Sequence, residues 1–251
     1  MRPSASRRFS FRSGAPYLVP MAAALLAGLG LWAARDRIVS LGAAVESPDT
    51  QIRRALASQV RAHLDEVYGF RAGGTAELSA VRYRDVVTSL EGERATVVAV
   101  LDAEGRVAWR GGTASLSYLG RERFHMRPCS IALWCAEGDQ FDRLRGVLLL
   151  LFRRADAFDA RDAGAYAALL SERYRDRGLD RAGVLRRLAE DLRAGPPAQV
   201  RLLGWQIRVD RETAEAGEDF ELSLPDQEPK RLRARYRLVL EESRWRIAGG
   251  L

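Results

Sequence analysis

An uncharged apolar run near the N-terminus restricts the fold of this chain more than any other feature. Residues 17–34, from Tyr17 to Ala34, contain no charged side chain. A helix of roughly 17–25 apolar residues is long enough to cross a bilayer. Tyr17 and Trp32 lie near the two ends of the run, where aromatic rings favour the headgroup region. We therefore predict a transmembrane anchor at residues 17–34.

The charges beside this run predict its orientation. Four arginines precede it and two follow closely, and basic residues favour the cytoplasmic side. Residues 1–16 are then a basic cytoplasmic tail, and the chain is a single-pass protein of the inner (cytoplasmic) membrane. The C-terminal domains would be extracytoplasmic, or periplasmic in a Gram-negative source. A cleaved signal peptide is the alternative, although Arg35 directly after Trp32-Ala33-Ala34 fits the small-residue cleavage pattern poorly.

The net charge of +7 is concentrated at the N-terminus. Residues 1–38 carry six arginines and one aspartate, so only +2 belongs to the rest of the chain. Binding driven by phosphate contacts requires an excess of basic residues on the folded domain. The near-neutral remainder therefore predicts no nucleic-acid partner.

Residues 35–50 are expected to be a linker, and residues 51–138 a first α+β unit. Apolar residues at three- and four-residue spacing predict a helix from Gln51 to Tyr68. Strand-like segments follow, separated by glycine-containing turns that include Asp102–Gly105 and Gly120–Glu122. The predicted strands are Ala80–Thr88, Arg94–Leu101, Arg106–Trp109, Thr113–Leu119 and Arg123–Cys135.

Residues 139–251 are expected to be a second unit, with helices first and strands after them. The predicted helices run from about Leu144 to Ala160, from a cap at Asp162, and from a cap at Asp180 to Gly195-Pro196. Alternating apolar residues predict antiparallel strands in the remainder. The class is therefore α+β, with sheets packed on helices.

A hairpin around the loop Pro225–Pro229 can be assigned a register. If Leu224 and Lys230 pair, apolar residues meet on one face and opposite charges on the other. The pairs would be Leu222 with Leu232, Phe220 with Ala234, Glu221 with Arg233 and Asp219 with Arg235. The row formed by Arg231, Arg233, Arg235 and Arg237 is then interpreted as a salt-bridged, solvated face rather than an anion site.

The order of elements in residues 139–251 resembles the nuclear transport factor 2-like superfamily, which includes SnoaL-like and ketosteroid-isomerase-like proteins. The likeness lies in the helix pair FDRLRGVLLLLFRRADAFDARDAGAYAALLSERY, in the late strand RARYRLVLEESRWRI, and in their spacing. It implies a cone in which a curved sheet wraps a long helix around a cavity. Residues 51–138 resemble a shorter, diverged copy. The resemblance implies no activity, because this fold hosts isomerases, hydrolases and assembly domains.

The predicted inward positions of the second unit contain no acid or histidine, so a general base is missing from its sheet. These positions are Leu203, Trp205, Ile207, Val209, Phe220, Leu222, Leu224, Tyr236, Leu238, Leu240, Trp245 and Ile247. The aromatic side chains of Tyr166, Tyr174, Trp205 and Tyr236 are candidate ligand-pocket residues. Core packing is the alternative, because buried aromatic residues dominate protein cores.

Asp85 is the candidate catalytic acid of the first unit. It shares the alternation of Val81, Tyr83 and Val87, which would direct it inward. Alternatively, a bulge or strand end returns its carboxylate to solvent, since unpaired buried carboxylates are rare. His63 and His125 are separated and have no clustered ligand partners, so we predict no metal site and no cofactor.

Cys129 and Cys135 are the only cysteines. In an extended strand, six residues would separate them by about 20 Å, whereas bridged Cα atoms lie within roughly 7 Å. A disulfide would therefore require a bend between them, and buried thiols are the alternative.

These observations predict a non-catalytic binding or assembly protein of the cell envelope. Its expected partners are the lipid bilayer, through residues 17–34, and another protein or a second copy of itself. A small apolar ligand is a further candidate. The alternative function is a small-molecule enzyme, isomerase- or hydrolase-like, that uses the cone cavity with Asp85 as acid or base.

Overall fold

The computed structural model describes residues 46–63, 67–69, 74–130, 133–138, 140–194, 199–225 and 227–250. Residues Pro48–Leu251 form one compact unit. Among the described residues, no helix has both the length and the apolar character needed to cross a membrane. The predicted anchor at residues 17–34 lies outside them.

The elements of Pro48–Leu251 confirm the predicted α+β class. In chain order, the first half contains α2 (Pro48–His63), β1 (Val67–Gly69), β2 (Gly74–Glu91), β3 (Arg94–Trp109), β4 (Gly112–Ser130) and β5 (Leu133–Glu137). The second half contains α3 (Asp142–Asp159), α4 (Ala163–Ala167), β6 (Arg175–Asp176), β7 (Leu179–Asp180), α5 (Arg181–Ala194), β8 (Gln199–Asp210), β9 (Thr213–Ser223), β10 (Lys230–Glu241) and β11 (Arg244–Gly249). Three helices followed by a meander in the second half is the order that the resemblance implies.

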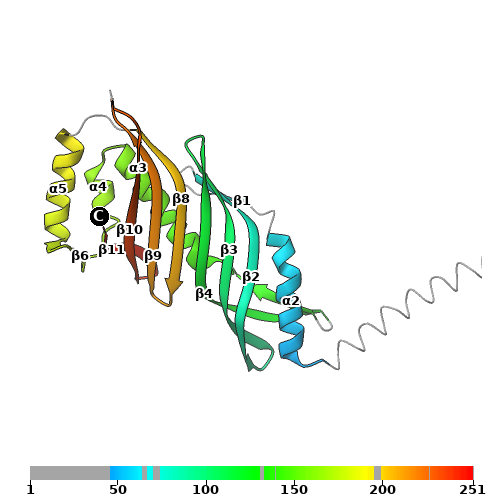
Figure 1. Ribbon diagram of the computed structural model, residues 1–251. Coiled ribbons are helices and arrows are strands. Elements are labelled where there is room, and N and C mark those ends of the chain that lie inside the picture. The colour runs from blue at the N-terminus through cyan, green and yellow to red at the C-terminus, as the bar shows by residue number, and fades with distance from the viewer. Residues whose placement is uncertain are drawn as a thin grey trace, which may run out of the picture. The chain divides into compact units, whose positions relative to one another are not determined.

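One large curved sheet runs through both halves (Figure 1). Its strand order in the described residues is β1-β2-β3-β4-β8-β9-β10-β11, and β5 pairs with the far end of β4. Every pairing in this sheet is antiparallel except that of β4 with β8, which is parallel. That single parallel pairing joins strands from residues 51–138 to strands from residues 139–251.

The described helices cover one face of the sheet. Leu101 and Ala103 of β3 belong to the larger core, which α3 supplies with Leu148 and Leu151. Farther along the same strand, Ala95 and Val97 pack in a second core with α2. Because β3 and β4 pair without a register shift, all these β3 residues lie on one face. We call it the inner face, and the opposite side, on which none of the described helices packs, the outer face.

Two predicted turns and one helix end were wrong. Asp102–Gly105 lies within β3 and Gly120–Glu122 within β4, whereas the predicted Gln51–Tyr68 helix ends at His63. The two glycines allow close approach rather than a turn. A Cβ on Gly105 would lie 2.1 Å from the Glu77 carbonyl oxygen, and one on Gly120 would lie 2.2 Å from the Tyr118 hydroxyl.

The predicted strand Arg123–Cys135 is instead a hairpin. Strand β4 ends at Ser130, and β5 returns antiparallel to it with Arg127 opposite Cys135. This reversal brings the Cα atoms of Cys129 and Cys135 to 5.8 Å, and the two residues form a disulfide. The separation expected of a continuous strand therefore does not apply.

The β9–β10 register differs from the predicted one by two residues. Lys230 pairs with Leu222, so Arg233 lies opposite Asp219. The reason is a turn in the loop: the Gln227 amide donates to the Leu224 carbonyl oxygen at 3.3 Å, which places Leu224 in the loop. The shift is even, so each side chain keeps its predicted face.

We expect reduction of the Cys129–Cys135 bridge to lower the free energy of unfolding by about 2 kcal/mol, because a short closed loop no longer restricts the unfolded chain. Chemical denaturation of the full chain with and without dithiothreitol measures this change. The Cys129→Ala/Cys135→Ala variant is the control and should not respond to reductant. An equal midpoint for the oxidised and reduced native protein would contradict the expectation.

Candidate functional site: a buried arginine–glutamate–tyrosine cluster

Arg154 is a buried charged residue of α3. It follows Val147 and Leu151 on the apolar stripe of the helix, whereas its neighbour Arg153 is exposed. Only 8% of Arg154 is accessible to solvent. A buried guanidinium requires partners, because an unpaired charge in the interior is costly.

The partners of Arg154 come from β9, β10 and α4. Its Nη2 atom donates to Oε2 of Glu218 at 2.5 Å, and Glu218 is only 2% exposed. The Tyr236 hydroxyl donates to the same carboxylate oxygen at 2.8 Å. The Arg154 Cζ atom lies 4.9 Å from the centre of the Tyr236 ring, a cation–π contact. Tyr166 of α4 also hydrogen-bonds with Arg154.

The ionisation of the cluster follows from burial and from the ion pair. Burial is the largest single effect and opposes the charge on Arg154, but Glu218, Tyr236 and Tyr166 together outweigh it, so the pKa of Arg154 is raised. Burial raises the pKa of Tyr166 and raises that of Tyr236 well above its ordinary value. Both phenols are therefore protonated at neutral pH, which keeps the Tyr236 hydroxyl available as the donor to Glu218.

All four candidate ligand-pocket residues lie in the core. Tyr166, Tyr174, Trp205 and Tyr236 are exposed by 1%, 0%, 1% and 2% respectively. The structure brings Tyr166 and Tyr236 together at Arg154, whereas Trp205 packs edge-on against Phe152 with ring centres 4.9 Å apart. The cluster is thus a paired interior charge in which only the Arg154 Nε atom has no hydrogen-bond partner among the described residues, and the pairing fits positioning of α3 on the sheet.

The expectation that no inward acid exists in the second unit was wrong. Glu218 pairs with Ala234 on β10 and with Trp205 on β8, and its side chain lies on the inner face. It precedes Phe220 by two residues, so the alternation assigned to Phe220 and Leu222 extends to it. Continuing that alternation by one step would have found the acid from the sequence.

A second buried acid lies in the first half, at Glu122 of β4. It is 2% exposed, and the Tyr118 hydroxyl hydrogen-bonds with its carboxylate. Burial raises the pKa of Tyr118 well above its ordinary value. The predicted turn at Gly120–Glu122 concealed this residue, because it removed Glu122 from the alternation of the strand. Nearby, Tyr83 packs against both cores and its hydroxyl donates to Oε1 of Gln140 at 2.6 Å.

Asp85 is exposed. It lies in an irregularity of β2 between Arg84 and Val87 and has a φ of 49°. The extra residue of a bulge changes the direction of the side chains that follow it. The structure therefore does not group this carboxylate with the two buried acids. It lies in solvent at a bulge, as the alternative interpretation of Asp85 predicts.

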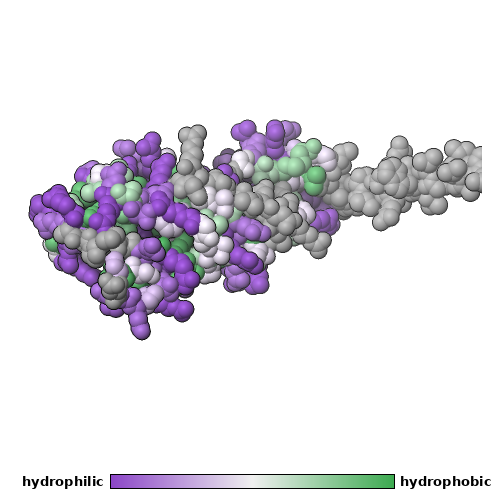
Figure 2. All heavy atoms as spheres, turned by 90° about the horizontal axis from the view of Figure 1, so that it is seen from above, coloured by the Kyte–Doolittle hydropathy of each residue, from purple (hydrophilic) through white to green (hydrophobic). Residues whose placement is uncertain are grey.

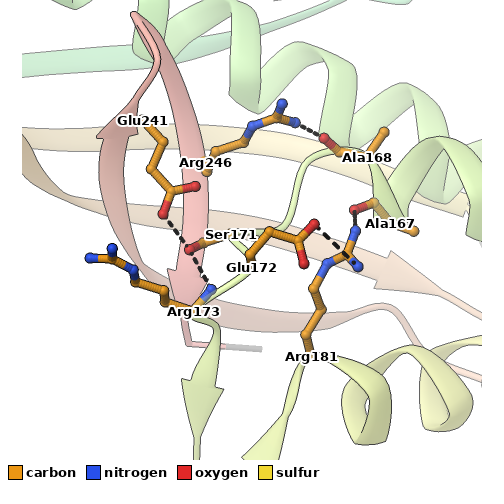
Figure 3. A network of polar contacts seen from close by, with 8 residues as sticks. All are labelled: Ala167, Ala168, Ser171, Glu172, Arg173, Arg181, Glu241 and Arg246. Atoms are coloured by element: carbon orange, nitrogen blue, oxygen red, sulfur yellow. Dashed lines mark hydrogen bonds and ion pairs between the residues drawn. The ribbon is translucent and has the colours of Figure 1, made fainter.

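A polar network fixes the segment after α4 against the sheet (Figure 3). The Ser171 hydroxyl donates to Oε1 of Glu241 at 2.7 Å and accepts from the Arg173 amide at 3.0 Å. On β11, the Ile247 carbonyl oxygen accepts from the Ser171 amide at 2.9 Å. These bonds hold the segment that leads to Tyr174 and connect it to the last hairpin.

Arginines complete this network. Arg181 donates to the Ala167 carbonyl oxygen at 3.1 Å and lies 3.5 Å from the Glu172 carboxylate. Arg246 of β11 donates to the Ala168 carbonyl oxygen. Carbonyl groups at the end of a helix lack intrahelical donors, so both guanidinium groups satisfy the end of α4.

Among the described residues, no group of three or more His, Cys, Asp or Glu side chains is placed to hold a metal ion. His125 is exposed, and its Nδ1 atom lies 3.3 Å from the Thr96 hydroxyl. The side chain of His63 falls outside the described part of the chain.

No protein-family model matches this sequence, and no curated protein matches it. Among solved structures, a nuclear transport factor 2-like protein of unknown function from Pseudomonas putida is 14% identical, with a TM-score of 0.40; the match covers 45% of this chain and 87% of that one. A proposed dehydratase of the same family from Streptomyces avermitilis is 14% identical, with a TM-score of 0.38 and coverages of 43% and 92%. A proposed ketosteroid isomerase from Shewanella frigidimarina is 10% identical, with a TM-score of 0.36 and coverages of 40% and 89%.

We expect Glu218→Leu to lower the free energy of unfolding by about 3–5 kcal/mol, because it leaves the Arg154 guanidinium buried without its carboxylate. The double variant Arg154→Met/Glu218→Leu should recover most of this loss, since it removes both charges. Chemical denaturation of the full-length variants measures the three free energies.

The matched control is Glu221→Leu on the same strand. Glu221 pairs with Arg201, whose side chain is 62% exposed, so its loss should cost at most about 1 kcal/mol. Equal losses for Glu218→Leu and Glu221→Leu, or a double variant as unstable as Glu218→Leu, would show that the buried pair does not position α3.

Proposed function

We propose that this chain is a non-catalytic binding and assembly protein of the cell envelope. Residues 17–34 would hold it in the inner membrane, with the N-terminus in the cytoplasm and Pro48–Leu251 outside. The observation that carries the proposal is an apolar strip on the outer face of β2, β3 and β4.

This outer-face strip consists of Val87, Val98, Val100 and Leu119. Val87 is 63% exposed and lies directly opposite Val98. Val100 follows Val98 on the same face of β3. Val100 pairs with Arg121 of β4, and Leu119 lies two residues before Arg121, opposite Asp102, so Leu119 is the diagonal neighbour of Val100. Figure 2 shows the molecule from above. Hydrophilic side chains predominate on the described part of that surface, and hydrophobic residues form only small groups there. A contiguous apolar strip with a charged surround is typical of a protein-binding surface.

The inner face supports a non-catalytic role. Its two buried carboxylates, Glu122 and Glu218, already accept hydrogen bonds from tyrosine hydroxyls, and Glu218 also pairs with Arg154. A general base needs a lone pair directed at a reacting proton. The enzymatic alternative depends on Asp85, whose exposed position on the bulge offers no enclosed site for a substrate.

Two observations support a location outside the cytoplasm. The Cys129–Cys135 disulfide is of the kind that persists in oxidising compartments. The basic tail before residue 17 favours retention of the N-terminus on the cytoplasmic side. The partner expected at the outer-face strip is therefore an envelope protein or a second copy of this chain.

A photoreactive amino acid at position 119 of the full-length protein, in its native membrane, should give one discrete cross-linked product. The same residue in place of Thr113, exposed on β4 outside the strip, should give none. Val87→Glu should abolish the product, because a charge in the strip must be desolvated on binding. Mass spectrometry of the product distinguishes self-association from a second protein. Equal products at positions 119 and 113, or none at either, would refute binding through the strip.

Protease treatment of intact spheroplasts tests the proposed orientation. With a tag at the C-terminus, external protease should remove the tag and leave a membrane-bound N-terminal fragment, because only the tail and anchor would be shielded. Lysed spheroplasts control for protease resistance of the fold itself. A tag that is protected in intact spheroplasts but digested after lysis would overturn the proposed location.

A further inference from the structure

A depression of about 400 Å³ lies over β8, β9 and β10, lined by Leu203, Asp219, Arg231, Leu232 and Arg233. We propose that it binds a small monoanionic carboxylate that carries an apolar group. The site is separate from the buried cluster at Arg154, and it does not depend on the partner proposed for the outer-face strip.

One arginine of the depression is held in place. The Nε atom of Arg233 lies 3.2 Å from Oδ1 of Asp219, and its Nη2 atom donates to Oε1 of Gln206 at 2.6 Å. Both acceptors belong to neighbouring strands, β9 and β8. Arg233 is therefore preorganised, which lowers the entropy lost when a ligand contacts its remaining donors.

The other arginine is left for a ligand. Arg231 lies opposite Glu221 in the ladder, but the Glu221 carboxylate accepts from Arg201 at 3.2 Å. In the part of the chain that the structure describes, no acceptor contacts the Arg231 guanidinium. Glu221 is committed to Arg201 and Asp219 to Arg233, and no second acid lies within the lining.

The charge of the lining selects a monoanion. Two guanidinium groups and one carboxylate give the depression a net charge of +1. A carboxylate matches that charge and the forked donors of arginine, whereas a phosphate dianion would leave an excess negative charge beside Asp219.

Leu203 provides an apolar wall. It is the extra residue of a bulge in β8, between the paired positions Leu202 and Gly204, and it is half-buried. Leu232 borders the depression through its backbone, because alternation along β10 directs its side chain to the inner face. The volume falls in the usual range for small-molecule sites, about 300–1,000 Å³. An anion with an apolar body of a few carbons therefore satisfies both parts of the lining.

Hexanoate is the probe, added to the full chain in lipid nanodiscs with methyl-labelled leucine. We expect saturable shifts of the Leu203 methyl signals. Arg231→Gln should weaken binding by about tenfold, the loss typical of a charge-assisted hydrogen bond. Leu203→Ser should weaken binding with the charge unchanged. Hexylammonium, hexanol and inorganic phosphate should each bind far more weakly than hexanoate.

Arg235→Gln is the matched control, because Arg235 is exposed on the same strand, opposite Gly217, and does not line the depression. Its affinity for hexanoate should equal that of the native protein. Equal weakening by Arg231→Gln and Arg235→Gln would indicate attraction to general surface charge and overturn the proposal. Hexanol or phosphate binding as tightly as hexanoate, or no saturable shift at all, would overturn it as well.

Discussion

The parallel pairing of β4 with β8 is the constraint on which the rest of the structure depends. It sets Leu116 beside Trp205 and Tyr118 beside Ile207, so that residues far apart in sequence share one core under α3. Without it, β4 and β8 would each be an open edge with a row of unpaired backbone groups. The pairing also gives the sheet one continuous inner face and one continuous outer face. The hydrophobic core therefore packs on one face, and the proposed binding surfaces lie on the other.

The buried charged residues of this fold pair with other buried side chains. Arg154 would be costly to bury alone, yet Glu218 neutralises its charge, and Tyr236 and Tyr166 contact it. Burial of a charged pair contributes little net stability, because desolvation offsets most of the attraction. Its effect is to fix where α3 sits, since only one placement of the helix brings the guanidinium to the carboxylate.

The sequence predicted what depends on local patterns. The α+β class, the helix from about Leu144 to Ala160, and the caps Asp162 and Asp180 are found as expected, and each cap accepts a backbone amide. What it could not predict depends on contacts between distant segments. Glycines such as Gly105 and Gly120 are typical of turns. Here they are needed within strands, because a Cβ would clash with the Glu77 carbonyl oxygen at Gly105 and with the Tyr118 ring at Gly120. Glu122 was hidden by one such turn. Glu218, by contrast, could have been predicted, because the alternation through Phe220 already included it.

The two surface features on the outer side of the sheet have different physical origins. The outer-face strip arises because β2–β4 carry apolar residues at outward positions as well as at inward ones, so the outer face is not wholly polar. The unpaired arginine of the depression arises because its neighbouring acids bind other arginines: Asp219 pairs with Arg233, and Glu221 with Arg201, which leaves Arg231 facing solvent among the described residues. An apolar strip suits a large partner, because its stabilisation grows with buried area. A single unpaired guanidinium beside Leu203 suits a small one, because its contribution depends on one well-oriented contact. A change in either surface should therefore leave the other intact, since no side chain belongs to both.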